Sequence, residues 1–359
     1  MTDETFQDVV ERVRPIDEVA AEAARLHHTK LTKPLGSLGR LEDLGVQLSA
    51  IAGAFPPPIP DPVTVAVFAG DHGVAASGVT PWPTEVTAQM VSNFCAGGAA
   101  INVLARQVGA VVRVVDVGVA TPIPGDAVGL TRRNVAHGTA NLAVQAAMSP
   151  AQVTRALDVG AEVAVESLAS GARLLVTGDM GIGNTTPSAA LIAAFTGASP
   201  ADVTGRGTGI DDATLLTKTR IVESALQRLA AGASPYDIVA EVGGLEIAAL
   251  AGYIVAGAAA RVPVVIDGVI SVAAALIATA LAPDAKGYLI GGHRSSEPGA
   301  RVGLTHLGLV PLLDLELRLG EGTGATLAVP LVQAAARVLR EMSTFDAAGV
   351  SERESGEQL

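Results

Sequence analysis

Short apolar runs rich in β-branched residues recur from residue 63 onward, and each is followed by glycine and then by a segment with helical spacing. Strands that are apolar on both sides and separated by helices are typical of a mostly parallel sheet covered on both faces. The pattern therefore predicts an α/β fold. The predicted strands are Val63 to Phe68, Val111 to Val117, Ala172 to Thr177, Pro263 to Ile266 and Gly287 to Ile290.

The two ends of the chain have a different pattern. Residues 1 to about 53 have helical spacing, interrupted by a glycine-rich turn from Lys33 to Gly39. Prolines exclude a helix or central strand from Phe55 to Pro62, so this segment is predicted to be a stiff connector. Helical spacing returns from Pro311 to about Met342, and the polar tail after it is expected to fray.

Hydropathy raises the alternative of a membrane permease. The mean hydropathy is +0.43, and the stretch from Leu245 to Val262 is strongly apolar. That stretch contains Glu246 and consists largely of Ala and Gly, whereas a membrane span needs about 20 strongly apolar residues. Ala-rich helices packed on a buried sheet explain the hydropathy better, so no membrane span is expected.

Charge and cysteine content narrow the functional class. The net charge of −12 repels a nucleic-acid backbone, so nucleic-acid binding is not expected. The acidic N-terminus lacks the basic start and apolar run of a signal peptide. The single cysteine, Cys95, excludes a disulfide framework and is interpreted as a small core residue. These features predict a cytoplasmic protein.

Polar and glycine-rich segments follow the predicted strands. In parallel sheets the ligand lies beyond the carboxyl ends of the strands, so these segments form the candidate site. They are Gly70 to Gly73, Gly118 to Gly129, Gly178 to Pro187, Asp267 to Gly268 and Gly291 to Gly299.

Three glycine-rich pieces are candidate phosphate loops. Gly178 to Thr186 lies between a strand and a helix, where glycines and free N–H groups can hold an anion. It lacks the full Gly-x-Gly-x-x-Gly order, so a simple tight turn is equally compatible. Lys218, on the helix after Gly205 to Gly209, either meets a phosphate or is solvated. Gly291 to Gly299, with Arg294, is either a third phosphate loop or a polar surface loop.

Metal catalysis is not expected, but one carboxylate stands out. The histidines form no His-x-x-x-His pair with a neighbouring acid, and Asp71-His72 is interpreted as a hydrogen-bonded loop pair.

Glu321 lies between two glycines, so a flat ligand can approach it across bare backbone. On local sequence alone, an acid that stabilises the start of the helix Ala325 to Leu339 is slightly favoured over a catalytic role.

Several motifs together resemble one family, the nicotinate-nucleotide:dimethylbenzimidazole phosphoribosyltransferases that make the lower ligand of cobalamin. The motifs recur in family order from about residue 15 to residue 340, so the resemblance covers nearly the whole chain. The matching pieces are Lys33 to Leu41, Ala69 to Val74, Gly178 to Pro187, Val242 to Glu246, Asp267 to Gly268 and Arg318 to Ala325.

The resemblance implies a Rossmann-like, mostly parallel sheet with helices on both faces over residues 61–310. A smaller helical domain is implied from residues 1–60 and 311–345, the latter carrying Glu321, with 346–359 as a flexible tail. The family also implies a homodimer in which the small domain of one subunit helps to close the active site of the other. No cofactor and no bound metal are implied.

The implied reaction moves the 5-phosphoribosyl group of nicotinate mononucleotide to 5,6-dimethylbenzimidazole with inversion at C1′, giving α-ribazole 5′-phosphate and nicotinate. Glu321 matches the general base that removes the benzimidazole N–H proton. Asp179 matches an acid near the ribose and the departing nicotinate. The matched substrate-binding positions are Trp82, Gln89, Met90, Gly181, Asn184, Thr185, Gly205, Gly207, Lys218, Ser295, Ser296 and Leu319.

Two departures from the family pattern leave details open. Some relatives have glutamate in place of Asp179, which is one methylene shorter. Some have serine where this chain has Trp82, whose ring either stacks on the acceptor base, narrows its pocket or simply packs, so other acceptor bases remain alternatives.

Two further alternatives concern the phosphoribosyl donor and the class of enzyme. Single acids at Val114 to Val117 and Val265 to Gly268 favour a nucleotide donor over phosphoribosyl pyrophosphate, whose enzymes commonly carry adjacent acids for magnesium. A nicotinamide-dependent dehydrogenase is the alternative from another class, but the full glycine fingerprint followed by an acid is missing.

Overall fold

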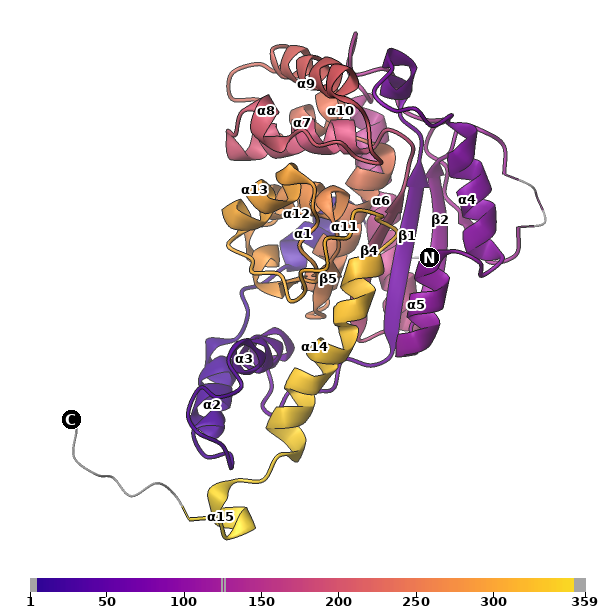
Figure 1. Cartoon of the computed structure of the whole chain (residues 1–359). Coiled ribbons are helices and arrows are strands. Elements are labelled where there is room, and N and C mark those ends of the chain that lie inside the picture. Colours follow the sequence, from indigo (N-terminus) through magenta and orange to yellow (C-terminus); the bar gives the residue numbers. More distant parts are fainter. Residues whose placement is uncertain (1–4, 124, 126, 352–359) are drawn as a thin grey trace. The chain divides into compact units, whose positions relative to one another are not determined.

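The computed structural model of the chain describes residues 5–123, 125 and 127–351. The chain divides into two compact units (Figure 1). The larger unit comprises Met1–Pro15 and Asp61–Val329, and the smaller unit comprises Ile16–Pro60 and Pro330–Leu359.

These boundaries differ from the predicted ones near both ends of the chain. Residues 1–15 and 311–329 belong to the larger unit, although the sequence placed them in the small helical domain. At the N-terminus the reason is α1 (Phe6–Arg12), which buries apolar side chains and packs against helices of the larger unit. The predicted connector contains the point at which the chain passes from one unit to the other, between Pro60 and Asp61.

A six-stranded parallel sheet forms the centre of the larger unit, in the order β3-β2-β1-β4-β5-β6. This is the strand order of the Rossmann fold, so the predicted fold class is confirmed. All five predicted strands are present, and β3 is a short sixth strand at one edge. The strands are β1 (Val63–Gly70), β2 (Val111–Gly118), β3 (Leu130–Arg132), β4 (Leu174–Met180), β5 (Val264–Ile266) and β6 (Leu289–Gly291).

The central strands are apolar because helices cover the sheet on both faces. All eight residues of β1 are buried. The chain proceeds outward from β1 in one direction and from β4 in the other, so right-handed crossovers place the connecting helices on opposite faces. The helices α4 (Glu85–Cys95) and α5 (Ala100–Val108) connect β1 to β2, whereas α11 (Leu245–Ala259) and α12 (Val269–Leu281) flank β5 in the sequence.

The remaining helical segments of the larger unit lie between these elements. They are η1 (Gly73–Ser77), α6 (Pro150–Ala169), α7 (Thr185–Thr196), α8 (Pro200–Val203), α9 (Asp212–Leu226), α10 (Pro235–Val242), η2 (Pro283–Tyr288) and α13 (Pro298–Leu307).

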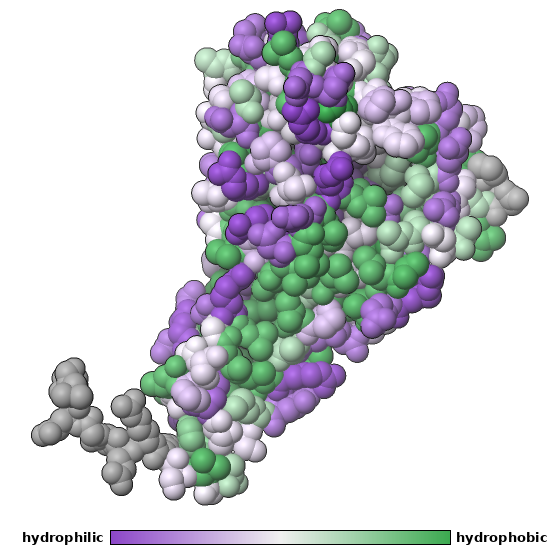
Figure 2. Space-filling view, viewed as in Figure 1, coloured by the Kyte–Doolittle hydropathy of each residue, from purple (hydrophilic) through white to green (hydrophobic). Residues whose placement is uncertain are grey.

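The apolar stretch that begins at Leu245 forms α11, which is buried along almost its whole length. It packs closely on α6 through glycines, since a Cβ on Gly160 would lie 1.8 Å from the carbonyl oxygen of Ala249. No helix in the described part of the chain is long and apolar enough to cross a membrane. At the α8–α10 end of the larger unit, the surface is largely hydrophilic or pale in Figure 2, so much of the high hydropathy belongs to the interior.

The smaller unit is helical and combines segments from both ends of the chain. It contains α2 (Glu18–His28), α3 (Arg40–Ala52), the later part of α14 (Thr323–Glu341) and α15 (Phe345–Ala348). The helix α15 occupies the start of the predicted tail, and residues 352–359 of that tail lie outside the described residues.

The predicted helix from Pro311 begins much later, at Thr323. The backbone takes left-handed φ angles at Glu316 and at each residue from Gly320 to Gly322, which a helix cannot accommodate. The segment pairs instead with the loop after β6, where the N–H of Arg294 donates to the carbonyl of Leu313 at 2.8 Å. This extended segment crosses the carboxyl ends of the strands and contributes to the site.

Candidate active site

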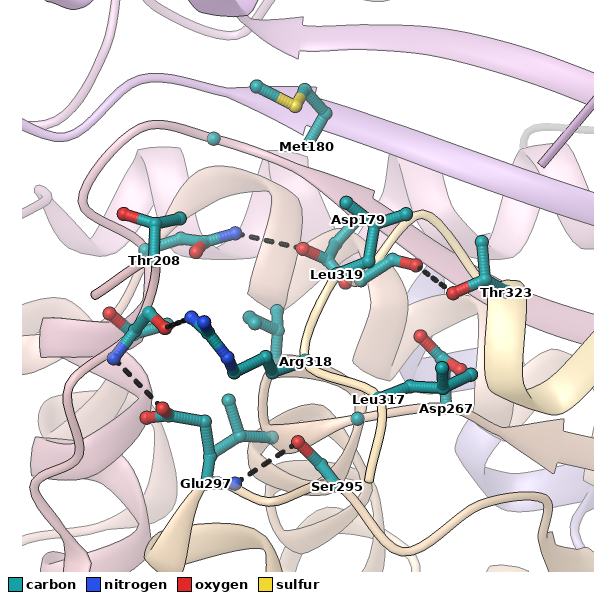
Figure 3. Close-up of a pocket in the computed structure, with 18 of the residues that line it drawn as sticks. Asp179, Met180, Thr208, Asp267, Ser295, Glu297, Leu317, Arg318, Leu319 and Thr323 are labelled. Carbon is teal, nitrogen blue, oxygen red and sulfur yellow. Dashed lines mark hydrogen bonds between the residues drawn. The ribbon is translucent and has the colours of Figure 1, made fainter. Parts of the chain in front are cut away.

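A cavity in the larger unit opens beyond the carboxyl ends of β4, β5 and β6 (Figure 3). This is the edge where parallel sheets bind ligands, next to the point between β1 and β4 at which the strand order reverses. Residues of five segments line the cavity: 179–185, 267–270, 293–297, 317–320 with Thr323, and Gly207–Thr208. The first, second and third of these were predicted from the polar residues that follow the strands.

Two buried acids, Asp179 and Asp267, lie in this cavity. Asp179 Oδ2 accepts a hydrogen bond from the side-chain amide of Asn184 at 2.9 Å. Burial, and then the nearby charge of Asp267, raise the pKa of Asp179 well above its ordinary value. Burial also raises the pKa of Asp267 to about 6, against the hydrogen bonds that its carboxylate accepts from backbone N–H groups. Asp179 is therefore the group in this cavity best suited to hold a proton at neutral pH.

Glu321 occupies a left-handed turn at the edge of the cavity. Its φ is 64°, between Gly320 at 81° and Gly322 at 89°. The turn packs tightly on β4, because a Cβ on Gly178 would lie 2.5 Å from the carbonyl oxygen of Glu321. Its neighbour Gly320 lines the cavity, whereas the Glu321 side chain is not among the lining residues.

The Glu321 carboxylate is buried and points to the start of α5. Its Oε2 accepts a hydrogen bond from the backbone N–H of Ile101 at 3.1 Å. Burial raises the pKa of Glu321, and the Ile101 N–H opposes that rise. The acid that stabilises the start of α14 is Asp267, which accepts from the N–H of Ala325 at 2.9 Å. The sequence left open whether Glu321 is catalytic or stabilises the start of this helix. In the structure Asp267, and not Glu321, makes the contact with the start of α14.

Lys218 is buried, with only 1% of its surface exposed, so the solvated alternative is wrong. Its ammonium group donates to Thr185 Oγ1 at 2.8 Å and to the carbonyl of Gly205 at 3.0 Å. Burial lowers the pKa of Lys218 to about 8, against the charge of Glu297. A second cavity joins Lys218 and Thr185 with Gly181, Asn184 and Gly207 of the predicted set, and Trp82 lies in its wall.

The loop Gly205–Gly209 is tied to the loop after β6. The N–H of Gly207 donates to Glu297 Oε1 at 2.8 Å, and Arg318 Nη1 donates to the carbonyl of Gly207 at 2.9 Å. Figure 3 shows both bonds, together with that from the N–H of Glu297 to Ser295 Oγ. A third cavity, lined by Gly205 and Ser296, adjoins the same loop. Two of the three candidate phosphate loops, Gly205 to Gly209 and Gly291 to Gly299, are therefore neighbours.

The remaining predicted residues lie less centrally. Trp82 is 50% exposed, so ordinary core packing does not describe it, and Leu319, at 58%, lines the main cavity. Gln89 is exposed and Met90 half-buried on α4, and neither lines the three cavities. Cys95 is half-buried rather than in the core.

Sequence reasoning gave no role to three residues of these cavities: Asp267, Glu297 and Arg318. Each was within a segment or motif that had been singled out, and the position after a strand was the available signal for Asp267. Their contacts with Ala325 and Gly207 span 58 to 111 residues of sequence, so no local pattern encodes them. Among the described residues, no group of three or more His, Cys, Asp or Glu side chains is placed to hold a metal ion.

Comparison with known proteins assigns the family. A family model described as phosphoribosyltransferase matches residues 13–350. The chain belongs to this phosphoribosyltransferase family. The phosphoribosyltransferase is thus an enzyme of the pentosyltransferase class, as the motifs predicted.

Relatives of this phosphoribosyltransferase are similar over nearly their whole length. A nicotinate-nucleotide–dimethylbenzimidazole phosphoribosyltransferase of Salinispora tropica is 55% identical over 355 residues, which cover 95% of this chain and 98% of the relative. A protein of the same name from Chloroflexus aurantiacus is 52% identical, with 97% and 99% covered. The crystal structure of CobT from Thermus thermophilus has a TM-score of 0.91 and 49% identity, and covers 93% of this chain and 100% of that one. The dehydrogenase alternative has no support among these findings.

Proposed function

We propose that the chain transfers the 5-phosphoribosyl group of nicotinate mononucleotide to 5,6-dimethylbenzimidazole, giving α-ribazole 5′-phosphate and nicotinate. The observation that carries the proposal is the buried carboxylate of Glu321, held in a glycine-flanked turn whose neighbour Gly320 shares a cavity with Asp179. The names of relatives that are 52% to 55% identical support the two substrates.

Glu321 is proposed as the general base. One benzimidazole nitrogen attacks ribose C1′ and forms the new C–N bond while the bond from C1′ to the nicotinate nitrogen breaks. The bonding electron pair leaves with nicotinate, whose ring loses its positive charge, and Glu321 takes the proton of the other benzimidazole nitrogen. Attack opposite to the leaving group inverts C1′ from β to α. A positioned base contributes roughly 10²- to 10⁴-fold to the rate, and alignment of the substrates contributes more.

The placement of the other groups supports binding of the acceptor base and of the nucleotide donor on opposite sides of the reaction centre. Glu321 points to α5, and the predicted base-binding residues Gln89 and Met90 lie on α4, while Trp82, in the turn before α4, lies in the wall of the Lys218 cavity. Asp179 and Lys218 belong to the cavities at the ends of the strands. We therefore assign the acceptor base to the α4–α5 side of Glu321 and the nucleotide to the strand side, which is the arrangement that inversion requires.

The nucleotide donor is proposed to lie between the two glycine-rich loops. The Lys218 ammonium, close to Thr185 and Gly205, is the cation available for the phosphate. Protonated Asp179 can donate a hydrogen bond toward the ribose or the departing nicotinate. Other substrate contacts are proposed for Gly181, Asn184, Gly207, Ser295, Ser296 and Leu319.

The proposal is tested by mixing the purified protein with nicotinate mononucleotide and 5,6-dimethylbenzimidazole, with a chelator and no added metal. Nicotinate and a riboside phosphate are expected in equal amounts, and proton NMR of the product is expected to show the α anomer. Absence of product, or a β product, contradicts the proposal. Replacing dimethylbenzimidazole by benzimidazole or adenine measures the acceptor range. The homodimer stays an expectation from the family resemblance, and the cytoplasmic location stays a prediction from the sequence.

A further inference from the structure

A histidine and a glutamate form a fully buried pair beneath the active-site turn. His72 follows β1, and Glu246 is in the first turn of α11. His72 Nε2 lies 2.7 Å from Glu246 Oε1, and both side chains are 0% exposed. Both belong to motifs that the sequence singled out, yet neither lines the main cavity or has a part in the proposed transfer.

Burial of this pair costs free energy unless other hydrogen bonds compensate for the lost contact with water. Removing a charged group from water costs several kcal/mol, and replacing a buried ion pair by apolar residues is often neutral or stabilising. Among the described residues, His72 Nδ1 and Glu246 Oε2 have no hydrogen-bond partner, so the pair is not embedded in a larger network that would repay its burial. Its persistence in the core is therefore better explained by a role than by stability.

The surroundings of His72 favour its protonated form. Burial lowers the pKa of His72, but the charge of Glu246, its hydrogen bond and the charge of Asp71 act in the opposite direction, and the net pKa is raised.

Three glycines bring the main chain into contact with the pair. A Cβ on Gly244 would lie 2.5 Å from His72 Cε1, and one on Gly70 would lie 3.0 Å from Glu246 Oε2. A Cβ on Gly181 would lie 2.3 Å from the carbonyl oxygen of Gly70 and 3.2 Å from His72 Nε2. Gly181 thus rests on the pair, without space for any side chain between them.

Gly181 connects this support to the site. It lines the main cavity and the Lys218 cavity, and its neighbours Asp179 and Asn184 line the main cavity as well. The turn is also held from α4, where Thr87 Oγ1 accepts from the N–H of Ile182 at 3.1 Å. A shift of the imidazole or of the carboxylate would move the backbone that faces the nucleotide.

We propose that His72 and Glu246 are positioning residues for the nucleotide donor. The two side chains hold the backbone of the turn Met180–Ile182 in the position required for binding nicotinate mononucleotide. The inference rests on the proposed function for the identity of the donor. It assigns no contact between the pair and the substrate. Loss of either partner should weaken donor binding and leave acceptor binding unchanged.

The test compares His72→Gln and Glu246→Gln in the full-length chain with Glu166→Gln as the control. Glu166 also pairs with an arginine in the larger unit, Arg113 at 3.0 Å, but lies outside the cavities. The dissociation constant of nicotinate mononucleotide is measured by titration calorimetry, and KM is measured separately for donor and acceptor. We expect the donor Kd and KM to rise at least tenfold in both variants, the acceptor KM to stay within twofold, and Glu166→Gln to match the unaltered chain.

Unchanged donor Kd at a temperature well below the melting transition, with or without a lower Tm, would overturn the inference, because the pair would then be only structural. If the two variants do not fold, Gly244→Ala provides the test, because its Cβ would lie 2.5 Å from His72 Cε1 and would displace the ring, while the extended backbone there accepts alanine. Folded Gly244→Ala with a raised donor Kd supports the inference, and an unchanged Kd contradicts it. Failure of the proposed function is seen separately, as absence of product with the unaltered chain.

Discussion

The carboxylate of Glu321 accepts a hydrogen bond from the backbone N–H of Ile101 at 3.1 Å, across 220 residues of sequence. This N–H is one of the first in α5, where helix N–H groups have no partner within the helix. The bond fixes the orientation of a carboxylate that burial makes easier to protonate. The candidate base is therefore held by the rigid end of a helix rather than by another loop.

Glu321→Gln should lower turnover by roughly 10²- to 10⁴-fold, because the amide keeps the shape and the contact with Ile101 but cannot take a proton. Nicotinate release under saturating substrates measures the effect, and circular dichroism checks the fold. Glu316→Gln is the matched control, since Glu316 is exposed in the same segment and also has a positive φ. Near-normal turnover of Glu321→Gln would remove this residue from the mechanism.

Donor binding should weaken as Lys218 loses its proton. Burial lowers the pKa of Lys218 to about 8, so its positive charge is present below that pH and is lost above it. We expect kcat/KM for nicotinate mononucleotide to decline above pH 8. Lys218→Met should lower it at least tenfold at pH 7 and abolish that decline, whereas Lys286→Met, on η2, should have no effect. An identical pH profile in Lys218→Met would contradict the assignment.

The buried Asp267 should make the fold less stable as the pH rises. Its pKa is raised from 3.8 to about 6, so the folded state binds a proton more tightly than the unfolded state. The resulting contribution to the free energy of unfolding is lost between about pH 4 and pH 6, and amounts to roughly 3 kcal/mol. Urea unfolding of Asp267→Asn should lack this loss. The exposed Asp314→Asn should follow the unaltered chain, and parallel curves for all three proteins would exclude the effect.

Trp82→Ala should affect the acceptor base alone. The ring is half exposed, so Tm should change little, while loss of stacking worth about 0.5–1.5 kcal/mol should raise the KM for dimethylbenzimidazole roughly two- to tenfold. Trp82→Phe, which keeps a ring, should restore most of the affinity. If instead the KM for the nucleotide rises equally, the ring has no specific role toward the acceptor.

Gly252→Ala should destabilise the larger unit. A Cβ there would lie 2.0 Å from the carbonyl oxygen of Leu157, where α11 packs on α6. Overpacking of this kind costs about 1–3 kcal/mol or more, so calorimetry should show Tm lower by several degrees. Val165→Ala, half exposed on α6, is the control and should shift Tm by little. A normal Tm for Gly252→Ala would mean that the two helices separate easily.

The fold was predictable because its strongest signals are local. Each strand that both faces bury is a continuous apolar run, and all five such runs were recognised. The short β3 was not, because its partly exposed residues Leu130 to Arg132 have no such pattern. The segment before α14 was assigned to a helix on spacing, although a run of left-handed φ angles from Gly320 onward prevents one.

The site was predictable only in part. Family motifs led to Glu321, Asp179 and Lys218, whose burial and contacts the structure then supplies. The burial of Lys218 depends on α7 and on the loop after α8, and nothing in its own helix indicates it. Likewise, no local spacing shows that His72 meets Glu246 across 174 residues.

The central position of β1 in the sheet also has a consequence for folding during synthesis of the chain. Val63 of β1 pairs with Leu174 of β4, about 110 residues later. At about 5–20 residues per second, translation leaves one side of this apolar strand without its partner for roughly 6–20 s. An unpaired apolar strand edge is prone to aggregation, so production of the protein should benefit from chaperones that bind nascent chains and from slow expression at low temperature.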